Sequence, residues 1–192
     1  MNGNIVKFIS AKSPDDVDYA SCGISDAILI DNTGMSSSKE GLEKHLKNKE
    51  IKKVLFTAPV AKELKNIVYG VNHDDIDDKD QIIGAASCTT NAIVPVLKAI
   101  DDEFEIDNGH VETIHSYTND QNLIDNYHSK SRRGRAAALN MVITETGAAK
   151  AVSQILPNLE GKLSANAIRV PTPNVSLAIL SLFLKKSSDQ EN

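Results

Sequence analysis

The feature that most constrains the fold is the alternation of short β-branched runs with segments of helical periodicity over the first half of the chain. Strands are predicted at residues 5–10, 27–31, 52–58, 66–71 and 81–86. A helix is predicted over residues 38–48, where Leu42, His45 and Leu46 share one face, so we expect a structural role for His45. This β-α-β order predicts an α/β fold with a largely parallel sheet.

The second half of the chain has longer strands and one long polar connection. A helix is predicted to begin at Ser87 or Cys88 and to reach about Asp102, with a kink or a late start at Pro95. Another helix is predicted at 146–156, and strands at 110–117, 166–170 and 175–184. Residues 118–145 are polar and basic, and they form a longer connection than is usual, which indicates a function. The change of pattern predicts two domains, residues 1–86 and 87–192.

Composition narrows the functional classes. The chain has 192 residues, is 41% hydrophobic and carries a net charge of -5, which gives no long-range attraction to nucleic acid or to an anionic membrane. Two cysteines do not make a disulfide framework, so we expect reduced thiols. A signal-peptide pattern and an apolar stretch of the roughly 20 residues that a membrane helix needs are both missing. We therefore expect a cytoplasmic protein, and we expect no metal site.

The motif AASCTTN, residues 85–91, places a thiol directly after a predicted strand and at the start of a predicted helix. The free N–H groups and the positive dipole end of a helix N-terminus favour the thiolate, which is the nucleophilic form. Ser87 and Thr89 are residue types that cap such a helix end. Cys88 is therefore a candidate nucleophile. The alternative is a buried cysteine before an ordinary capped helix.

A thiol nucleophile usually needs a base, and a phosphorylated substrate needs anion-binding groups. Among the five histidines, His115 is the better base candidate, because a polar segment follows it; the alternative is a hydrogen-bonded core histidine. Thr146 and Gly147 begin a predicted helix whose N–H groups suit a phosphate. The remaining cationic candidates are Arg132, Arg133, Arg135 and Arg169. The alternative for the arginine cluster of the loop is a solvated face or a set of interface salt bridges.

Several motifs together resemble those of the phosphorylating glyceraldehyde-3-phosphate dehydrogenases. ASCTTN is similar to the active-site signature of that family. The resemblance continues, in order, through HSYTNDQ (115–121), RRGRAAALN (132–140), TGAAKAV (146–152) and RVPTPNVS (169–176). Upstream, DNTG (31–34), TAP (57–59) and YGVNH (69–73) also fit. The resemblance covers nearly the whole chain.

The resemblance implies an NAD-dependent oxidation of glyceraldehyde 3-phosphate to 1,3-bisphosphoglycerate, a step of glycolysis and gluconeogenesis. Cys88 matches the nucleophile that forms the thioester, and His115 matches the residue that activates the thiol. Residues that match binders of the attacking phosphate are Ser87, Thr89, Thr146 and Gly147. Residues that match the site for the substrate's own phosphate are Thr118, Asp120 and Arg169, and Arg133 or Arg135 would support the anion sites and subunit contacts. Thr33, Gly34 and Thr57 match positions that line the nicotinamide cofactor.

The implied fold is the second half of a Rossmann-type dinucleotide-binding domain followed by the first part of an α+β catalytic domain, in a homotetramer. The chain departs from the family pattern because it has no G-x-G-x-x-G motif and stops before the family's last strands. It is therefore interpreted as an internal fragment that is inactive in isolation, with no role carried over to residues 35–38. The choice between NAD and NADP stays open. The alternatives are erythrose-4-phosphate dehydrogenase, which departs from SYTNDQ and TGAAKAV, and a non-catalytic truncated product.

Overall fold

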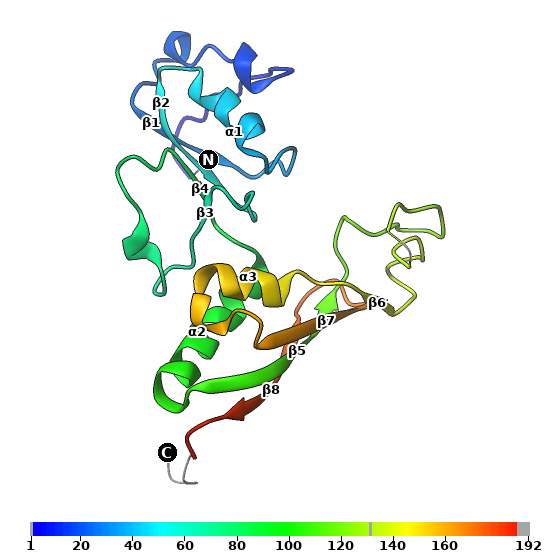
Figure 1. Cartoon of the computed structure of the whole chain (residues 1–192). Helices are drawn as coiled ribbons and strands as arrows, with labels where there is room; N and C mark the ends of the chain where they lie inside the picture. The colour runs from blue at the N-terminus through cyan, green and yellow to red at the C-terminus, as the bar shows by residue number, and fades with distance from the viewer. Residues whose placement is uncertain (1, 131, 188–192) are drawn as a thin grey trace. The chain divides into compact units, whose positions relative to one another are not determined.

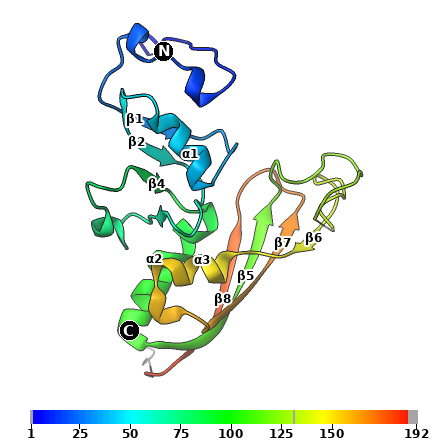
Figure 2. The same ribbon diagram turned by 45° about the horizontal axis from the view of Figure 1, so that its top comes forward.

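The computed structural model describes residues 2–130 and 132–187, and the chain divides into two compact units. The first unit comprises residues 1–91 and the second residues 92–192. The division falls inside helix α2 (Cys88–Phe104), a few residues after the boundary predicted between residues 86 and 87. Figures 1 and 2 show the elements of each unit from two directions.

The first unit is built on a parallel sheet. Its strands, in spatial order, are β1 (Ala27–Asp31), β2 (Ile51–Phe56), β4 (Ile82–Gly84) and β3 (Lys65–Asn66). Helix α1 (Lys39–Leu46) connects β1 to β2, and the side chain of Ser38 caps it by accepting the Gly41 N–H at 3.1 Å. Leu42 of this helix is buried with Val54 and Phe56 of β2, so the apolar face predicted for the helix is the one that packs on the sheet.

Two predicted strands of the first unit are wrong. Residues 5–10 have no regular structure and pair with no strand of the described residues, and Ile5 and Phe8 are almost fully exposed. The strand predicted at 66–71 is reduced to β3, because the Asn72 side chain takes over its backbone groups. Asn72 accepts the Val68 N–H at 2.8 Å and donates to the Asn66 carbonyl at 3.0 Å. Side-chain bonds of this kind replace a strand ladder by a turn.

The second unit has a mixed sheet with two helices. Its strands, in spatial order, are β6 (Val142–Thr144), β7 (Leu163–Val170), β5 (Ile106–Ser116) and β8 (Leu177–Leu184). Strand β5 runs parallel to β7 and antiparallel to β8, and β6 runs antiparallel to β7. Helices α2 and α3 (Ala148–Ile155) lie beside each other in both views. Their buried residues include Leu97 and Val152, and Val111 of β5 is buried as well, which defines the core of this unit.

Helix α2 begins at Cys88 even though Pro95 lies inside it, so the late start considered for this helix is wrong. Strand β6 lies within the stretch predicted as a continuous loop. Short 3-10 helices, η1 to η4, occur at Pro14–Asp16, Ala20–Cys22, His73–Asp75 and Pro157–Leu159. The predicted α/β class is confirmed in the coarse sense that the described residues form a parallel sheet and a mixed sheet together with helices. Within residues 2–130 and 132–187, no helix combines the length and the apolar character needed to cross a membrane.

Candidate functional site

The three residues predicted to line a cofactor gather at the carboxyl end of β1. Asp31, the last residue of β1, accepts the Thr33 N–H at 2.8 Å and the Thr33 hydroxyl at 2.7 Å. The Asp31 carbonyl accepts the Thr57 N–H at 2.9 Å and its hydroxyl at 3.3 Å. Gly34 has a φ of 69°, which glycine adopts without strain, and a Cβ there would meet open space. Ligands of open parallel sheets bind at this carboxyl edge, so the placement suits a small-molecule site.

Asp31 and His45 form a pair that the sequence reasoning missed. His45 Nε2 lies 3.2 Å from Asp31 Oδ2, and both side chains are largely buried. They line a pocket of about 550 Å³ together with Thr33, Lys44 and Tyr19. The predicted structural role of His45 therefore includes a polar contact, which holds the carboxylate that orders Thr33. No local sequence signal links residues 31 and 45, because the contact depends on how α1 packs on β1 and β2.

Asp31 is expected to stabilise the first unit at neutral pH and to lose this effect in acid. Burial alone would raise the pKa of the Asp31 carboxyl, but the bonds from Thr33 and His45 outweigh it and hold the pKa below its ordinary value. A carboxyl whose pKa is lowered by folding contributes stability above its unfolded pKa and loses it as the pH falls through the folded pKa.

Asp31→Asn should therefore lower the free energy of unfolding by about 1 kcal/mol at neutral pH, and this difference should shrink towards zero in acid. Urea unfolding curves of both proteins, recorded at neutral pH and in acid, measure this difference. Asp26→Asn is a matched control, because the Asp26 side chain is 78% exposed. An equal effect of Asp31→Asn at both pH values would contradict the expectation.

Cys88 occupies the first position of α2, shortly after the carboxyl end of β4. Ser87 is the N-cap residue, since its hydroxyl accepts the Thr90 N–H at 3.0 Å and its carbonyl accepts the Asn91 N–H at 2.9 Å. The Ser87 and Thr90 hydroxyls are 2.7 Å apart. Cys88 is exposed and is a thiol, so the alternative of a buried cysteine is wrong. Ala86 just before the cap has a φ of 56°, an uncommon value that turns the chain from strand to helix.

A second polar cluster lies in the second unit around Asp120. The carboxylate accepts the Thr118 hydroxyl at 2.5 Å and forms an ion pair with Arg133, and Arg169 Nη2 lies 4.0 Å from Asp120 Oδ1. Arg133 is 7% exposed and also donates from Nε to the Thr144 hydroxyl at 3.0 Å. Burial would raise the pKa of Asp120, but the Thr118 hydroxyl and the charges of Arg133 and Arg169 hold the pKa below its ordinary value. The cluster thus keeps one carboxylate ionised between two guanidinium groups.

His115 and Arg169 are neighbours in the register of β5 and β7. Arg169 Nη1 lies 2.6 Å from His115 Nδ1 and 3.1 Å from the Ser116 carbonyl oxygen. His115 Nδ1 lies 2.7 Å from the same carbonyl oxygen. The structure therefore brings together His115, Thr118, Asp120 and Arg169, which the sequence separates by up to 54 positions.

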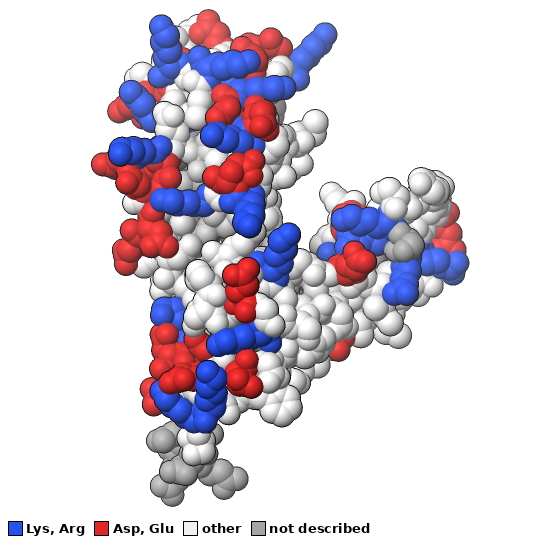
Figure 3. All heavy atoms as spheres, in the orientation of Figure 1, with Lys and Arg blue, Asp and Glu red and all other residues white. Residues whose placement is uncertain are grey.

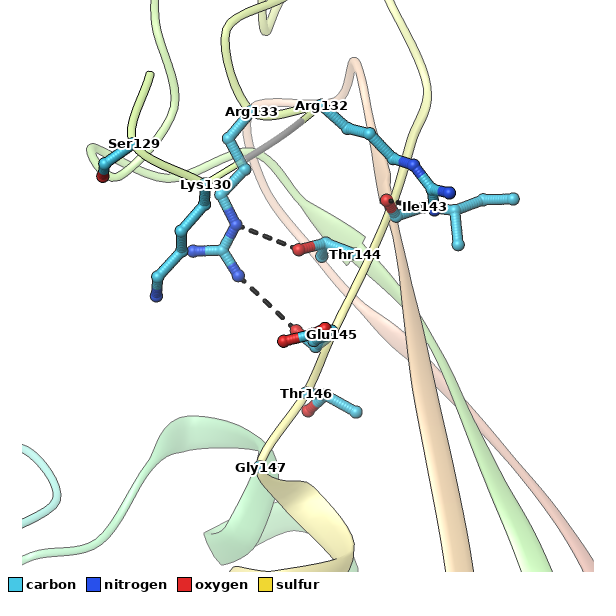
Figure 4. A pocket seen from close by; sticks show the side chains of 9 residues that line it. All are labelled: Ser129, Lys130, Arg132, Arg133, Ile143, Thr144, Glu145, Thr146 and Gly147. Carbon is cyan, nitrogen blue, oxygen red and sulfur yellow. Dashed lines mark hydrogen bonds between the residues drawn. The ribbon is translucent and has the colours of Figure 1, made fainter.

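A pocket of about 700 Å³ lies beside this cluster in the second unit (Figure 4). Its lining residues are Ser129, Lys130, Arg132, Arg133, Ile143, Thr144, Glu145, Thr146 and Gly147. Thr146 and Gly147 lie at the start of α3, where the Thr146 hydroxyl accepts the Ala148 N–H at 3.2 Å. Figure 4 shows the Glu145 side chain on the same side of its segment as those of Arg133 and Lys130. Sequence reasoning did not single out Glu145, although it directly precedes the Thr-Gly pair.

Arg135 is not part of this pocket lining. Its guanidinium pairs with Asp125 at 3.2 Å, and both side chains are more than half exposed.

Over the visible face in Figure 3, basic and acidic side chains are interspersed rather than separated into large patches of one sign. Among the described residues, no group of three or more His, Cys, Asp or Glu residues is arranged to hold a metal ion. The structure therefore offers local anion-binding groups within a surface of mixed charge.

Comparisons with known proteins agree with the motifs. Residues 87–192 match the family described as Glyceraldehyde 3-phosphate dehydrogenase, C-terminal domain. A glyceraldehyde-3-phosphate dehydrogenase-like protein of Pseudomonas aeruginosa (strain UCBPP-PA14) is 61% identical over 190 residues, which cover 99% of this chain and 41% of that relative. Glyceraldehyde-3-phosphate dehydrogenase A, chloroplastic, of Zea mays is 45% identical over 188 residues, covering 98% of this chain and 46% of that relative.

Glyceraldehyde-3-phosphate dehydrogenase 2 of Trichormus variabilis (strain ATCC 29413 / PCC 7937) is 45% identical over 192 residues, covering 100% of this chain and 56% of that relative. The chain thus spans about half the length of the curated relatives that it matches.

Proposed function

Because this chain belongs to the glyceraldehyde-3-phosphate dehydrogenase family, we propose that it contributes to the NAD-dependent oxidative phosphorylation of glyceraldehyde 3-phosphate. The observation that carries the proposal is Cys88, an exposed thiol at the first position of a helix that Ser87 caps. The N–H groups and the dipole of such a helix end stabilise negative charge, which suits both a thiolate and an oxyanion formed next to it. This position of the thiol supports the proposal of covalent catalysis at Cys88.

The proposed reaction proceeds by acyl transfer through sulfur. Cys88 Sγ attacks the aldehyde carbon while His115 accepts the thiol proton and passes it to the former carbonyl oxygen, which gives a thiohemiacetal. Transfer of a hydride to an acceptor, which a bound nicotinamide cofactor would supply, and of the hydroxyl proton to His115 converts this adduct to a thioester on Cys88. An oxygen of inorganic phosphate then attacks the thioester carbon, the carbon–sulfur bond breaks, and the acyl phosphate leaves as the thiolate is regenerated.

The cofactor-binding part of the proposal concerns the carboxyl edge of the parallel sheet. Thr33, Gly34 and Thr57 would line a nicotinamide cofactor, which supplies the acceptor for the hydride when bound. Two hydroxyls and an open glycine backbone fit such a group, because Gly34 leaves room for a close approach. We propose residues 1–86 as part of a Rossmann-type cofactor domain and residues 87–192 as part of the catalytic domain of a homotetramer.

The anion sites divide by position. We propose that Thr118 and Arg169 bind the substrate's phosphate, and that Asp120 belongs to this site by orienting the guanidinium through its charge. The groups proposed for the attacking phosphate are Ser87, Thr89, Thr146 and Gly147. Arg133 is proposed to support these sites through Asp120 and Thr144, and Arg135 to support subunit contacts from its exposed position.

The proposal is tested by acyl transfer without a cofactor. On incubation with p-nitrophenyl acetate, the chain should release one equivalent of p-nitrophenolate and carry an acetyl thioester that peptide mass spectrometry locates at Cys88. Addition of inorganic phosphate should then yield acetyl phosphate, detected by phosphorus NMR. Cys22→Ser should behave as the wild type, and Cys88→Ser should give neither product. Equal acetylation of Cys22 and Cys88, or acetate as the only product, would contradict the proposal.

Glu145 is expected to weaken the binding of the attacking phosphate. Its carboxylate lines the same pocket as Thr146 and Gly147, so it repels a phosphate anion there. At a separation of several ångströms and a surface-like dielectric, this repulsion amounts to roughly 1 kcal/mol. Glu145→Gln should therefore raise the affinity for inorganic phosphate about fivefold to tenfold, as measured by calorimetric titration. Glu160→Gln, an exposed residue outside the pocket lining, should leave the affinity unchanged; an unchanged affinity in Glu145→Gln would refute the expectation.

A further inference from the structure

We propose that Arg169 decides which ring nitrogen of His115 carries the proton, and that an anion bound to Arg169 switches His115 to the tautomer that acts as a base. Arg169 would then be a positioning residue that makes the base available only when the anionic part of a substrate is present. The inference rests on the proposed function, because it takes His115 to be the base.

The argument starts from two contacts made by the same atom. His115 Nδ1 lies 2.7 Å from the Ser116 carbonyl oxygen and 2.6 Å from Arg169 Nη1. A carbonyl oxygen can only accept a hydrogen bond, and a guanidinium nitrogen can only donate one. Nδ1 therefore has to carry a proton to bond with Ser116, and has to offer its lone pair to bond with Arg169. The two bonds exclude each other, so the two contacts correspond to two different tautomers.

The tautomers differ in what the opposite ring nitrogen can do. While Arg169 donates to Nδ1, the proton of the neutral ring lies on Nε2, and Nε2 has no lone pair with which to accept a proton. When Nδ1–H donates to the Ser116 carbonyl, Nε2 offers its lone pair and can act as a general base. The exchange moves one proton from Nε2 to Nδ1 through water and leaves the charge of the ring unchanged.

The contacts of Arg169 explain why an anion can move it. Arg169 Nη1 also lies 3.1 Å from the Ser116 carbonyl, so in the first tautomer the guanidinium takes the carbonyl position that Nδ1–H takes in the second. The Asp120 carboxylate is 4.0 Å from Arg169 Nη2, and it already accepts from Thr118 and pairs with Arg133. Thr118 and Arg133 therefore offset part of the negative charge with which Asp120 attracts Arg169.

A phosphate binds the guanidinium more strongly than the neutral Ser116 carbonyl and His115 Nδ1 do. It can accept two parallel charge-assisted hydrogen bonds, which are roughly twice as strong as neutral ones. The Arg169 side chain is 15% exposed, so an anion can reach it from solvent. The paired register of His115 and Arg169 in β5 and β7 holds both backbones in place, so only side-chain movement is needed.

The tautomer is measured directly by nitrogen NMR of the chain labelled at its histidine rings, where protonated and unprotonated ring nitrogens have well-separated shifts. His115→Asn identifies the signals of His115 by their loss. Without added anion, the His115 signals should show mostly the Nε2–H form. Saturation with glycerol 3-phosphate should convert it to mostly the Nδ1–H form, a change of about tenfold in the tautomer ratio, which corresponds to about 1.4 kcal/mol.

Two variants complete the test. Arg169→Leu should show the Nδ1–H form with and without glycerol 3-phosphate, and Lys186→Leu, whose lysine is exposed and pairs with Glu105, should behave as the wild type. The wild-type titration decides the question even if Arg169→Leu fails to fold. A wild-type chain in the Nδ1–H form without anion, a doubly protonated ring, or an Nε2–H form that saturating anion leaves unchanged would each overturn the inference. None of these results depends on acylation of Cys88, so the proposed function can stand or fall separately.

Discussion

His115→Asn is expected to slow the acetylation of Cys88 by p-nitrophenyl acetate by about 10²-fold when glycerol 3-phosphate is present, because a positioned base contributes roughly 10²–10⁴-fold to such reactions. Asparagine keeps a polar side chain in β5 but cannot accept the thiol proton. The release of p-nitrophenolate, followed over time, measures the rate. Cys88 and His115 belong to different units of the chain, so the acetylation rate tests whether the two residues act together.

His110→Asn is the matched control for this experiment. His110 lies on the same strand, five residues earlier and therefore on the opposite face, where it bonds to Ser164 at 2.8 Å and to Asn166 at 2.5 Å. Its replacement should leave the acetylation rate of Cys88 unchanged. If His115→Asn and His110→Asn react as fast as the wild type, His115 does not serve as the base.

Asp120→Ala is expected to lower the free energy of unfolding of the second unit by about 2 kcal/mol. The change leaves the buried Arg133 guanidinium without its carboxylate, and breaking a buried ion pair from one side typically costs roughly 3–5 kcal/mol. The lower figure of about 2 kcal/mol applies because the Asp120 side chain is 42% exposed and water screens part of the interaction. Urea unfolding followed by circular dichroism measures the loss.

Two further variants sharpen this test. Asp102→Ala removes a carboxylate from an exposed pair with Lys98 on α2, and it should cost only about 0.5 kcal/mol. Combining Asp120→Ala with Arg133→Met should recover part of the stability, because the uncompensated charge is then gone. If the stability lost in the double variant equals the sum of the losses in the two single variants, Asp120 and Arg133 do not stabilise each other.

Local pattern explains which elements the sequence predicted well. Strand β1 coincides with the predicted residues 27–31, and α1 lies within the predicted residues 38–48. In α1 the apolar residues mark the side that is buried, whereas in β1 only Ala27 and Leu29 pack on the core, and Ile28 and Ile30 are exposed. The apolar residues of 5–10 have the same local pattern, but no neighbouring strand edge among the described residues receives them. A strand depends on a partner distant in sequence, and its own residues do not reveal whether that partner exists.

The candidate site divides in the same way. Cys88, Thr146 and Gly147 were predictable because each lies at a helix start, which short sequences signal through capping residues. The pair of Asp31 with His45 and the placement of Glu145 in the pocket were not predictable, since they depend on packing of separate segments. The residue roles themselves stay predictions for the experiments above.

The sequence by itself determined the family, the capped start of α2 at Cys88 and the alternation of strands and helices, because motifs and periodicity act over a few neighbouring residues. Only the tertiary structure decided that His115 Nδ1 lies between the Ser116 carbonyl and Arg169, and that Asp120 lies between Arg133 and Arg169. The first contact requires β5 and β7 to pair in one register, and the second requires the long loop to return to the sheet. Such contacts arise from the burial and hydrogen bonding of the whole unit, which no short segment contains.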